Sequence, residues 1–345
     1  MKKSLYFLSA LTLLTTTAFA NAEIKEETVN TETEVMSTVE VPTSTWSFTG
    51  RTYLEFEDFD NNATINRGNK EGVMNKLGSG SDGTFWGTGI SASKDKLTLD
   101  LNVERRYFGD LNSSLGGSKS DTTRVDYKVR YQLLPKQGFH VKYRNDKNNG
   151  SRRDRIELGT DFNYFDNLLA GWLVVGHDKD KTYSSYDATG KYTPSKSSTG
   201  TYWEGDFGPT FKLSEKLSLN PTLYTTGEFY DSYEMVETQL RIMVPYQVNE
   251  KLTVMPRIRL TLDRTQDSKD SNGKWCTDYE QKLGDKIRYE LLANYIINEN
   301  LSTFMGIAYE DGKRDFKNSD RFGEGENGKK DVSLIWTYVG LNYKF

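Results

Sequence analysis

Two histidines and one cysteine are the only residues of their types in the 345-residue chain, which restricts the nucleophilic and metal chemistry it could perform. His177 precedes Asp178, a pair that could serve general acid–base hydrolysis beside a nucleophile. His140 has basic neighbours and no serine at an obvious hydrogen-bonding register. Cys276, in a predicted loop, is read as an incidental free thiol, with an intermolecular disulfide as the alternative. The sequence contains no Cys/His cluster at metal-ligand spacing and predicts neither a metal nor a cofactor.

Charged residues recur instead at every second position of strand-length segments. From Val125 to Leu133, apolar and aromatic residues alternate with Asp, Lys, Arg and Gln. Strict alternation predicts strands with one apolar and one polar face. Charged residues make up 27% of the chain, yet the apolar faces hold almost none apart from Arg105 at a strand end. If the polar faces line a closed barrel, the candidate lining residues are Arg51, Glu55, Arg106, Arg124, Asp126, Lys128, Arg130, Lys142, Arg144, Arg155, Glu157, Glu204, Asp206, Glu228, Glu237, Arg241, Arg257, Arg259, Arg288 and Glu290, with Asp100, Glu104, Asp161 and Asp263 as further acidic candidates.

About fourteen segments show this alternation, which predicts an all-β chain. They start near Trp46, Thr84, Leu97, Thr122, Gly138, Arg155, Leu168, Tyr202, Leu217, Val236, Leu252, Lys286, Leu301 and Val332. Short turns alternate with longer loops, which are predicted at roughly 59–83, 108–121, 178–200, 265–284 and 311–330. Short turns at one end and long loops at the other are typical of outer-membrane barrels.

Three further features favour a membrane barrel over a soluble sandwich, whose apolar faces would meet in a core. Aromatic residues such as Trp86 and Tyr309 lie near strand ends on the apolar face, as an interfacial girdle requires. Each apolar face covers about nine to eleven residues, which suits a tilted transmembrane strand. The final alternating segment ends in Phe345, as does the assembly signal of bacterial outer-membrane proteins. The sequence therefore predicts a transmembrane antiparallel up-and-down β-barrel.

The amino-terminal region predicts export. Lys2 and Lys3 precede an apolar run and small residues suited to cleavage, the order found in secretory signal peptides. Residues 23–43 are acidic and threonine-rich, which predicts a mostly disordered periplasmic extension, with a short partner-binding element as the alternative. The predicted organisation is a signal peptide at 1–22, this extension at 23–43 and a barrel at 44–345 in the bacterial outer membrane.

Over about residues 44–345 the chain resembles the monomeric porins of the outer membrane protein G type and the major porins of the FomA type. The resemblance rests on strand number, on the alternation of turns and loops, and on the final segment 336–345. It implies a wide, weakly selective channel formed by one chain. In outer membrane protein G, lumenal histidines on neighbouring strands gate the pore with pH. Here His140 and His177 fall on the fifth and seventh predicted strands, so that gate is not expected.

These features predict a porin without enzymatic activity, through which small hydrophilic solutes and ions diffuse passively. Charges on the inner face are tolerable beside water, because a buried unpaired charge is very costly. We expect the basic residues of strands four to six to form a positive wall opposite Glu204, Asp206 and Glu228, which would orient polar solutes. The alternative is that these charges pair across strands and hold the barrel round.

Two other functional classes fit parts of the sequence. A surface adhesin or structural barrel would use the loops rich in Lys, Asp, Ser and Gly. A barrel protease or phospholipase would need His177 or His140 as a catalytic base. The expected partners are outer-membrane lipid, small hydrophilic solutes and ions, and the barrel-assembly machinery acting on Phe345, with no nucleic acid.

Overall fold

The computed structural model describes residues 45–61, 83–108, 121–186, 192–270, 272–317 and 327–345. Strands occupy most of these ranges, and none of the described residues belongs to a helix long and apolar enough to cross a membrane. The predicted signal peptide and extension, and most of the loops predicted at 59–83 and 108–121, lie outside the described residues. The strands are β1 (Ser47–Asn61), β2 (Gly83–Lys94), β3 (Leu97–Phe108), β4 (Thr122–Leu134), β5 (Gln137–Lys147), β6 (Ser151–Tyr164), β7 (Leu169–Thr182), β8 (Ser185–Tyr186), β9 (Tyr192–Thr193), β10 (Lys196–Gly208), β11 (Phe211–Lys212), β12 (Ser218–Tyr230), β13 (Tyr233–Met243), β14 (Tyr246–Gln247), β15 (Leu252–Lys269), β16 (Trp275–Lys282), β17 (Lys286–Ile296), β18 (Leu301–Phe316) and β19 (Gly328–Lys344).

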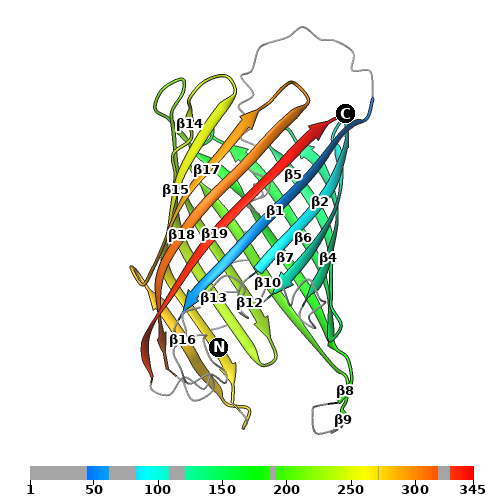
Figure 1. The fold of residues 1–345 in the computed structure, drawn as a ribbon, viewed down its shortest axis with the longest axis vertical. Coiled ribbons are helices and arrows are strands. Elements are labelled where there is room, and N and C mark those ends of the chain that lie inside the picture. The colour runs from blue at the N-terminus through cyan, green and yellow to red at the C-terminus, as the bar shows by residue number, and fades with distance from the viewer. Residues whose placement is uncertain (1–44, 62–82, 109–120, 187–191, 271, 318–326) are drawn as a thin grey trace.

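The long strands form one closed antiparallel barrel of 14 strands, as the alternation predicts. Thirteen of the fourteen junctions join strands that follow one another in the chain, and the last joins β1 to β19 from Thr49–Lys344 to Asn61–Val332. Figure 1 shows the red and blue strands side by side at this closure. β16 and β17 both lie between β15 and β18, so together they make one barrel strand. The predicted all-β barrel is confirmed.

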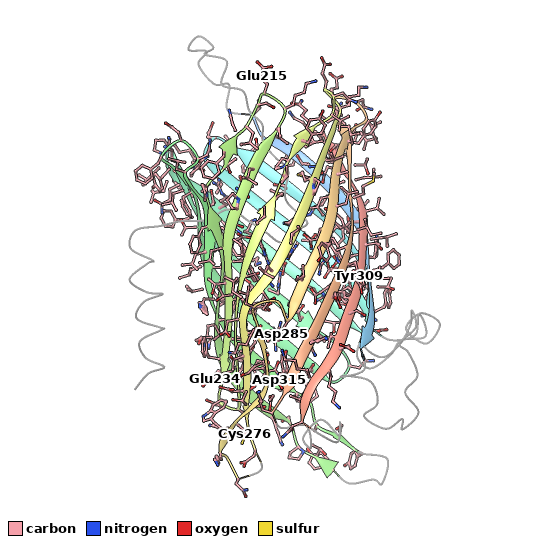
Figure 2. The ribbon with its side chains drawn as sticks, turned by 90° about the vertical axis from the view of Figure 1, so that its left-hand side faces the viewer. Glu215, Glu234, Cys276, Asp285, Tyr309 and Asp315 are labelled. Atoms are coloured by element: carbon pink, nitrogen blue, oxygen red, sulfur yellow. The ribbon has the colours of Figure 1, made fainter. Side chains whose placement is uncertain are left out.

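Short turns and longer excursions lie at opposite ends of the cylinder. The carboxyl terminus lies at the turn end, and the β8–β9 hairpin lies at the other end (Figure 1). Figure 2 likewise places Glu215, in a short turn, and Cys276 at opposite ends. Asp95 adopts the left-handed conformation, with φ 52°, in the tight turn between β2 and β3. Asp is among the residues that tolerate this conformation best, which explains why a two-residue connection is possible there.

The strands run further toward the loop end than the apolar pattern predicts. The predicted loop at 265–284 is wrong: β15 continues to Lys269 and β16 begins at Trp275. Likewise β18 continues to Phe316, β19 begins at Gly328, and β7 and β10 extend into the predicted loop at 178–200. Outside a bilayer the outer face of a strand can be polar, so the backbone ladder continues after the apolar alternation stops.

The apolar faces point outward, and the charged faces point into the barrel. On β6, Leu158 is 57% exposed while the preceding residue, Glu157, is 2% exposed. On β18, Ile307 and Tyr309 are 54% and 49% exposed, whereas Ala308 between them is buried. Large apolar side chains are exposed on the outer face of nearly every barrel strand. Such a continuous surface greatly exceeds the patch of a few hundred Å² that a soluble monomer exposes, and it suits contact with lipid acyl chains.

A β-bulge changes which residues of β15 face inward. The pairing with β13 shifts between Thr238 and Gln239, so that β15 contributes one extra residue. Beyond it Arg264, paired with Glu237 at 2.6 Å, takes the inward position. Asp263, predicted to face inward, is instead exposed and lies 2.7 Å from Nζ of Lys282. The extra residue reverses the alternation, because the side-chain period of a strand is two.

Candidate functional site in the barrel interior

All twenty predicted lining residues lie on the inward face of their strands, and none of them is exposed. Ten are buried, namely Glu55, Asp126, Arg144, Arg155, Glu157, Asp206, Glu237, Arg241, Arg257 and Glu290. The other ten, Arg51, Arg106, Arg124, Lys128, Arg130, Lys142, Glu204, Glu228, Arg259 and Arg288, are partly buried. The alternation of each strand accounts for this placement, because it leaves the inner face as the only polar one.

On β3 to β7 the charges form rows in which acidic and basic residues are matched. Residues that face one another across neighbouring strands follow the register Asp126–Arg144–Arg155–Asp178. Arg144 donates two hydrogen bonds to Asp126, at 2.8 and 2.9 Å, and Arg155 donates two to Asp178, at 2.6 and 2.7 Å. Bidentate pairs of this kind are strong and fix geometry. We call this arrangement, together with the rows on either side of it, the balanced rows; their other ion pairs are Lys128–Asp100, Lys142–Glu157, Arg124–Asp146 and Arg153–Asp180.

The expected positive wall is therefore compensated. Each of its six basic residues has a carboxylate within 4 Å; the pairs are Arg124–Asp146, Lys128–Asp100, Arg130–Asp161, Lys142–Glu157, Arg144–Asp126 and Arg155–Asp178. The three carboxylates expected to face this wall have nearby partners as well. Glu204 accepts a hydrogen bond from Tyr224, Asp206 lies 2.7 Å from Arg241, and Glu228 lies 3.7 Å from Arg155. Pairing between nearby strands, the alternative prediction, describes this part of the interior.

A different arrangement occurs on β13, β15 and β17, where four arginines gather. We call Arg241, Arg257, Arg259 and Arg288 the arginine cluster. Glu290 contacts three of its members: it is bonded to Nε of Arg257 and lies 3.0 Å from Nη2 of Arg259 and 2.7 Å from Nε of Arg288. The fourth, Arg241, contacts Asp206. The ring of Tyr224 lies 3.5 Å from the guanidinium carbon of Arg241, so cation–π contact also holds this side chain.

Toward the turn end, apolar side chains occupy the inward face, which the sequence analysis did not predict. Met255, Leu292 and Trp336 belong to a buried cluster on β1, β13, β15 and β17 to β19, whose other members are Tyr53, Met243, Phe304, Ala308, Leu334 and Tyr338. The guanidinium of Arg288 lies 4.7 Å from the centre of the Trp336 ring, where the two clusters meet. Met255 lies two positions from Arg257, and Leu292 lies two positions from Glu290. Because residues two apart on a strand share a face, this spacing is the sequence signal that identifies the inward apolar side chains.

Glycines on neighbouring strands make room for the large inner rings. Gly87 faces Tyr53 across β1 and β2, and a Cβ on this glycine would lie 2.0 Å from the ring. Gly176 holds the same relation to Tyr202 on β10. These ring–glycine pairs let the interior hold bulky aromatic residues flat against the wall.

At the loop end a pocket of about 310 Å³ opens on the inward side of β3 to β7. Its charged lining is mostly basic, with Arg106, Arg124, Arg152, Arg153 and Lys181 against Asp146 and Asp180. Asp146 and Asp180, like Asp178, were missed by the sequence analysis because they lie at or beyond the predicted strand ends. A concave, mostly basic surface concentrates anions.

The histidines do not form a catalytic arrangement with their neighbours. His177 is exposed on the outer face of β7, whereas Asp178 faces inward and is bonded to Arg155. Successive residues of a strand point to opposite faces, so this pair cannot act as a dyad. His140 is buried on β5 and His177 lies on β7, so β6 separates the two histidines, as predicted. Within the described ranges, no three His, Cys, Asp or Glu side chains are grouped as a metal site requires.

Comparison with known proteins gives structural neighbours only. No family model and no curated sequence matches the chain. It is similar to OmpT, an outer membrane protein of Vibrio cholerae, with 13% identity, 90% of this chain and 100% of that chain covered, and a TM-score of 0.41. It is also similar to the outer membrane channel DcaP of Acinetobacter baumannii (11% identity, 88% and 97% covered, TM-score 0.41) and to a Pseudomonas aeruginosa FadL homologue (10% identity, 86% and 90% covered, TM-score 0.43). The resemblance to outer membrane protein G and FomA porins stays a prediction, and the chain is a closed antiparallel β-barrel of 14 strands.

Proposed function

We propose that this chain is an outer-membrane porin that lets small hydrophilic solutes and ions diffuse through its interior. The main support for this proposal is that apolar side chains lie on the outside of the barrel and charged ones on the inside, the reverse of a soluble protein. Leu158 and Ile307 are exposed outward, while Glu157 and Arg257 are buried inward. A closed barrel with an apolar outside and a charged inside satisfies its backbone polar groups in a bilayer and keeps its charges away from lipid.

Strand number supports a channel rather than a solid barrel. Side chains can fill a barrel of about eight strands, whereas barrels of about 16–18 strands enclose an aqueous channel. The 14 strands found here approach the second group. The inner arginines and carboxylates lie along the wall in pairs, so that each charge is compensated where solvent reaches it poorly.

The experiment is permeation through the purified barrel refolded into liposomes. We expect liposomes containing the barrel to swell in isotonic solutions of small sugars, at rates that fall as the sugar becomes larger. Planar bilayers should show discrete conductance steps in KCl. Liposomes without protein and liposomes given heat-unfolded protein are the controls. A refolded barrel that admits neither sugars nor ions would overturn the porin proposal and favour the adhesin or structural alternative.

A further inference from the structure

The arginine cluster contains more positive charge than its carboxylates balance. In the balanced rows each basic side chain has its own acidic partner, as Arg144 has Asp126 and Arg155 has Asp178. In the arginine cluster a single carboxylate, Glu290, serves three guanidinium groups. Glu310 lies 3.9 Å from Nη1 of Arg288, at the limit of an ion pair. Arginine remains charged in proteins, so the local excess is positive.

The register makes this excess expensive for the fold. Arg241 faces Arg259 across β13 and β15, and Arg259 faces Arg288 across β15 and β17. Like charges directly opposite one another on neighbouring strands destabilise a sheet. The balanced row also places Arg144 opposite Arg155, but a carboxylate ends that row on both sides. The arginine row extends over three strands and has a carboxylate, Glu310, on one side only, a feature that folding alone does not favour.

Donors of this row also lack well-aligned acceptors. Nε of Arg259 is buried and has no hydrogen-bond partner among the described residues. Nε of Arg288 lies 2.7 Å from Oε1 of Glu290 but is not aligned for a hydrogen bond with it. Nη2 of Arg259 is in the same condition, since the Glu290 oxygen 3.0 Å away is not aligned with its hydrogens. The Arg259 side chain is only 10% exposed, so solvent reaches it poorly. Unsatisfied guanidinium donors in a planar fork match the two oxygens of a carboxylate or the oxygens of a phosphate.

Apolar side chains border the arginine cluster. Trp336 lies against Arg288, and Met243 faces Arg257 across β13 and β15. A solute whose anionic group reaches the arginines can therefore place an apolar part against this neighbouring surface. Few polar groups beside a mainly apolar wall are typical of sites that hold small molecules.

We propose that the arginine cluster is a binding site for an oxyanion, the carboxylate or phosphate group of a solute passing through the barrel. Arg259 supplies the unpaired donor Nε, Arg288 and Arg241 add charge, and Glu290 orients the guanidinium groups. The site rests on the proposed channel function and gives it a preference for anionic solutes.

The test measures how added anions reduce the KCl current through the refolded barrel in planar bilayers. The probes are sodium benzoate, inorganic phosphate and, as a neutral control, benzamide. In the unsubstituted protein we expect benzoate, phosphate or both to reduce the current saturably, and benzamide to leave it unchanged. Block by benzoate alone assigns a carboxylate, and block by phosphate alone assigns a phosphate. A protein that conducts KCl but is blocked by neither anion overturns the site, whereas a protein that conducts nothing overturns the porin proposal itself.

Substitutions locate the block within the barrel. Arg259→Gln should raise the anion concentration for half-maximal block by about tenfold, the effect of removing one charge-assisted pair. Arg259→Lys should recover part of this loss, because it keeps the charge and loses the fork. Arg144→Gln, which removes a guanidinium from a balanced row, is the matched control and should change the half-maximal concentration less than twofold by the same measure. Equal block in Arg259→Gln and the unsubstituted protein would overturn the assignment; Arg241→Gln replaces Arg259→Gln if that variant does not refold, with the same expected direction.

Discussion

In the balanced rows each buried basic side chain is stabilised by a carboxylate from a nearby strand. Asp178 shows this most completely: its side chain is inaccessible to solvent, and it accepts hydrogen bonds from Arg155 and from the hydroxyl of Tyr230. Removing one member of such a pair leaves the other buried without compensation, which costs more than the pair contributes.

Asp178→Asn should therefore destabilise the barrel by about 3 kcal/mol, near the lower end for a broken buried pair, because Glu228 remains close to Arg155. The measurement is urea-induced unfolding of the refolded protein in lipid vesicles, followed by tryptophan fluorescence. Asp166→Asn is the matched control, since Asp166 is fully exposed in a turn beside Lys136. Equal free energies of unfolding for the two variants would contradict the structural role of the Asp178–Arg155 pair.

Alternation identifies the inward charges that lie in the middle of strands, such as Arg257 and Glu157, because their neighbours on both sides are apolar. It cannot identify their partners, because pairing depends on the register between strands and on side-chain length. Asp263 was misplaced for a related reason: the bulge that reverses its orientation is a property of two strands together. The surplus of arginine beside Glu290 appears only when β13, β15 and β17 are aligned.

At the scale of elements, the carboxylate of Asp285 stabilises the turn that joins β16 to β17. Asp285 accepts a hydrogen bond from the backbone N–H of Lys282 at 2.9 Å and one from Nζ of Lys329 at 2.6 Å. Gly284 beside it has φ 86°, which favours glycine. This turn lies beyond Tyr309 toward the loop end (Figure 2), among the exposed charged pairs Lys282–Asp263 and Lys313–Asp331. Burial raises the pKa of Asp285, but the hydrogen bonds from Lys329 and Lys282 outweigh it and hold the pKa below its ordinary 3.8.

A lowered pKa in the folded state predicts a specific pH dependence for this turn. The carboxylate stabilises the fold above its unfolded-state pKa, and this contribution is lost as pH falls through the folded-state pKa. The unsubstituted barrel should thus be more stable than Asp285→Asn at neutral pH, and the difference should shrink below about pH 4. Urea unfolding over a range of pH measures this difference. Lys329→Gln should reproduce part of the loss; a difference between the unsubstituted protein and Asp285→Asn that stays constant down to pH 2 would contradict the role of the carboxylate.

Strand existence was predictable because the apolar alternation repeats in every segment, and starts such as Leu97, Thr122, Leu252 and Leu301 coincide with the observed ones. Strand ends toward the loops were not predictable. There both faces of a strand meet water or polar neighbours, so β15 and β16 continue as a ladder without any apolar signal. Their inner residues Ser268 and Asp278 are buried polar partners, which no hydrophobic pattern reveals.

For the whole molecule, the decisive property is the direction in which the apolar faces point. The alternation alone fits both a soluble sandwich and a membrane barrel, because each excludes charge from one face. Closure of β1 on β19 and the exposure of the apolar faces distinguish the two. The interior also contains the buried apolar cluster around Met255 and Trp336, so it is only partly ionic. A rule that places all apolar residues outside and all charged residues inside does not predict this cluster.

The most direct test is to measure whether the outer face of β18 contacts lipid or water. In a Cys276→Ser background, single spin labels are placed at Ile307→Cys and Lys313→Cys, two exposed positions of the same strand. After refolding into lipid vesicles, the label at 307 should be relaxed more by oxygen dissolved among acyl chains than by a water-soluble nickel chelate, and the label at 313 should show the reverse. Nickel dominating at position 307 in a folded barrel would contradict the claim that the apolar faces touch lipid.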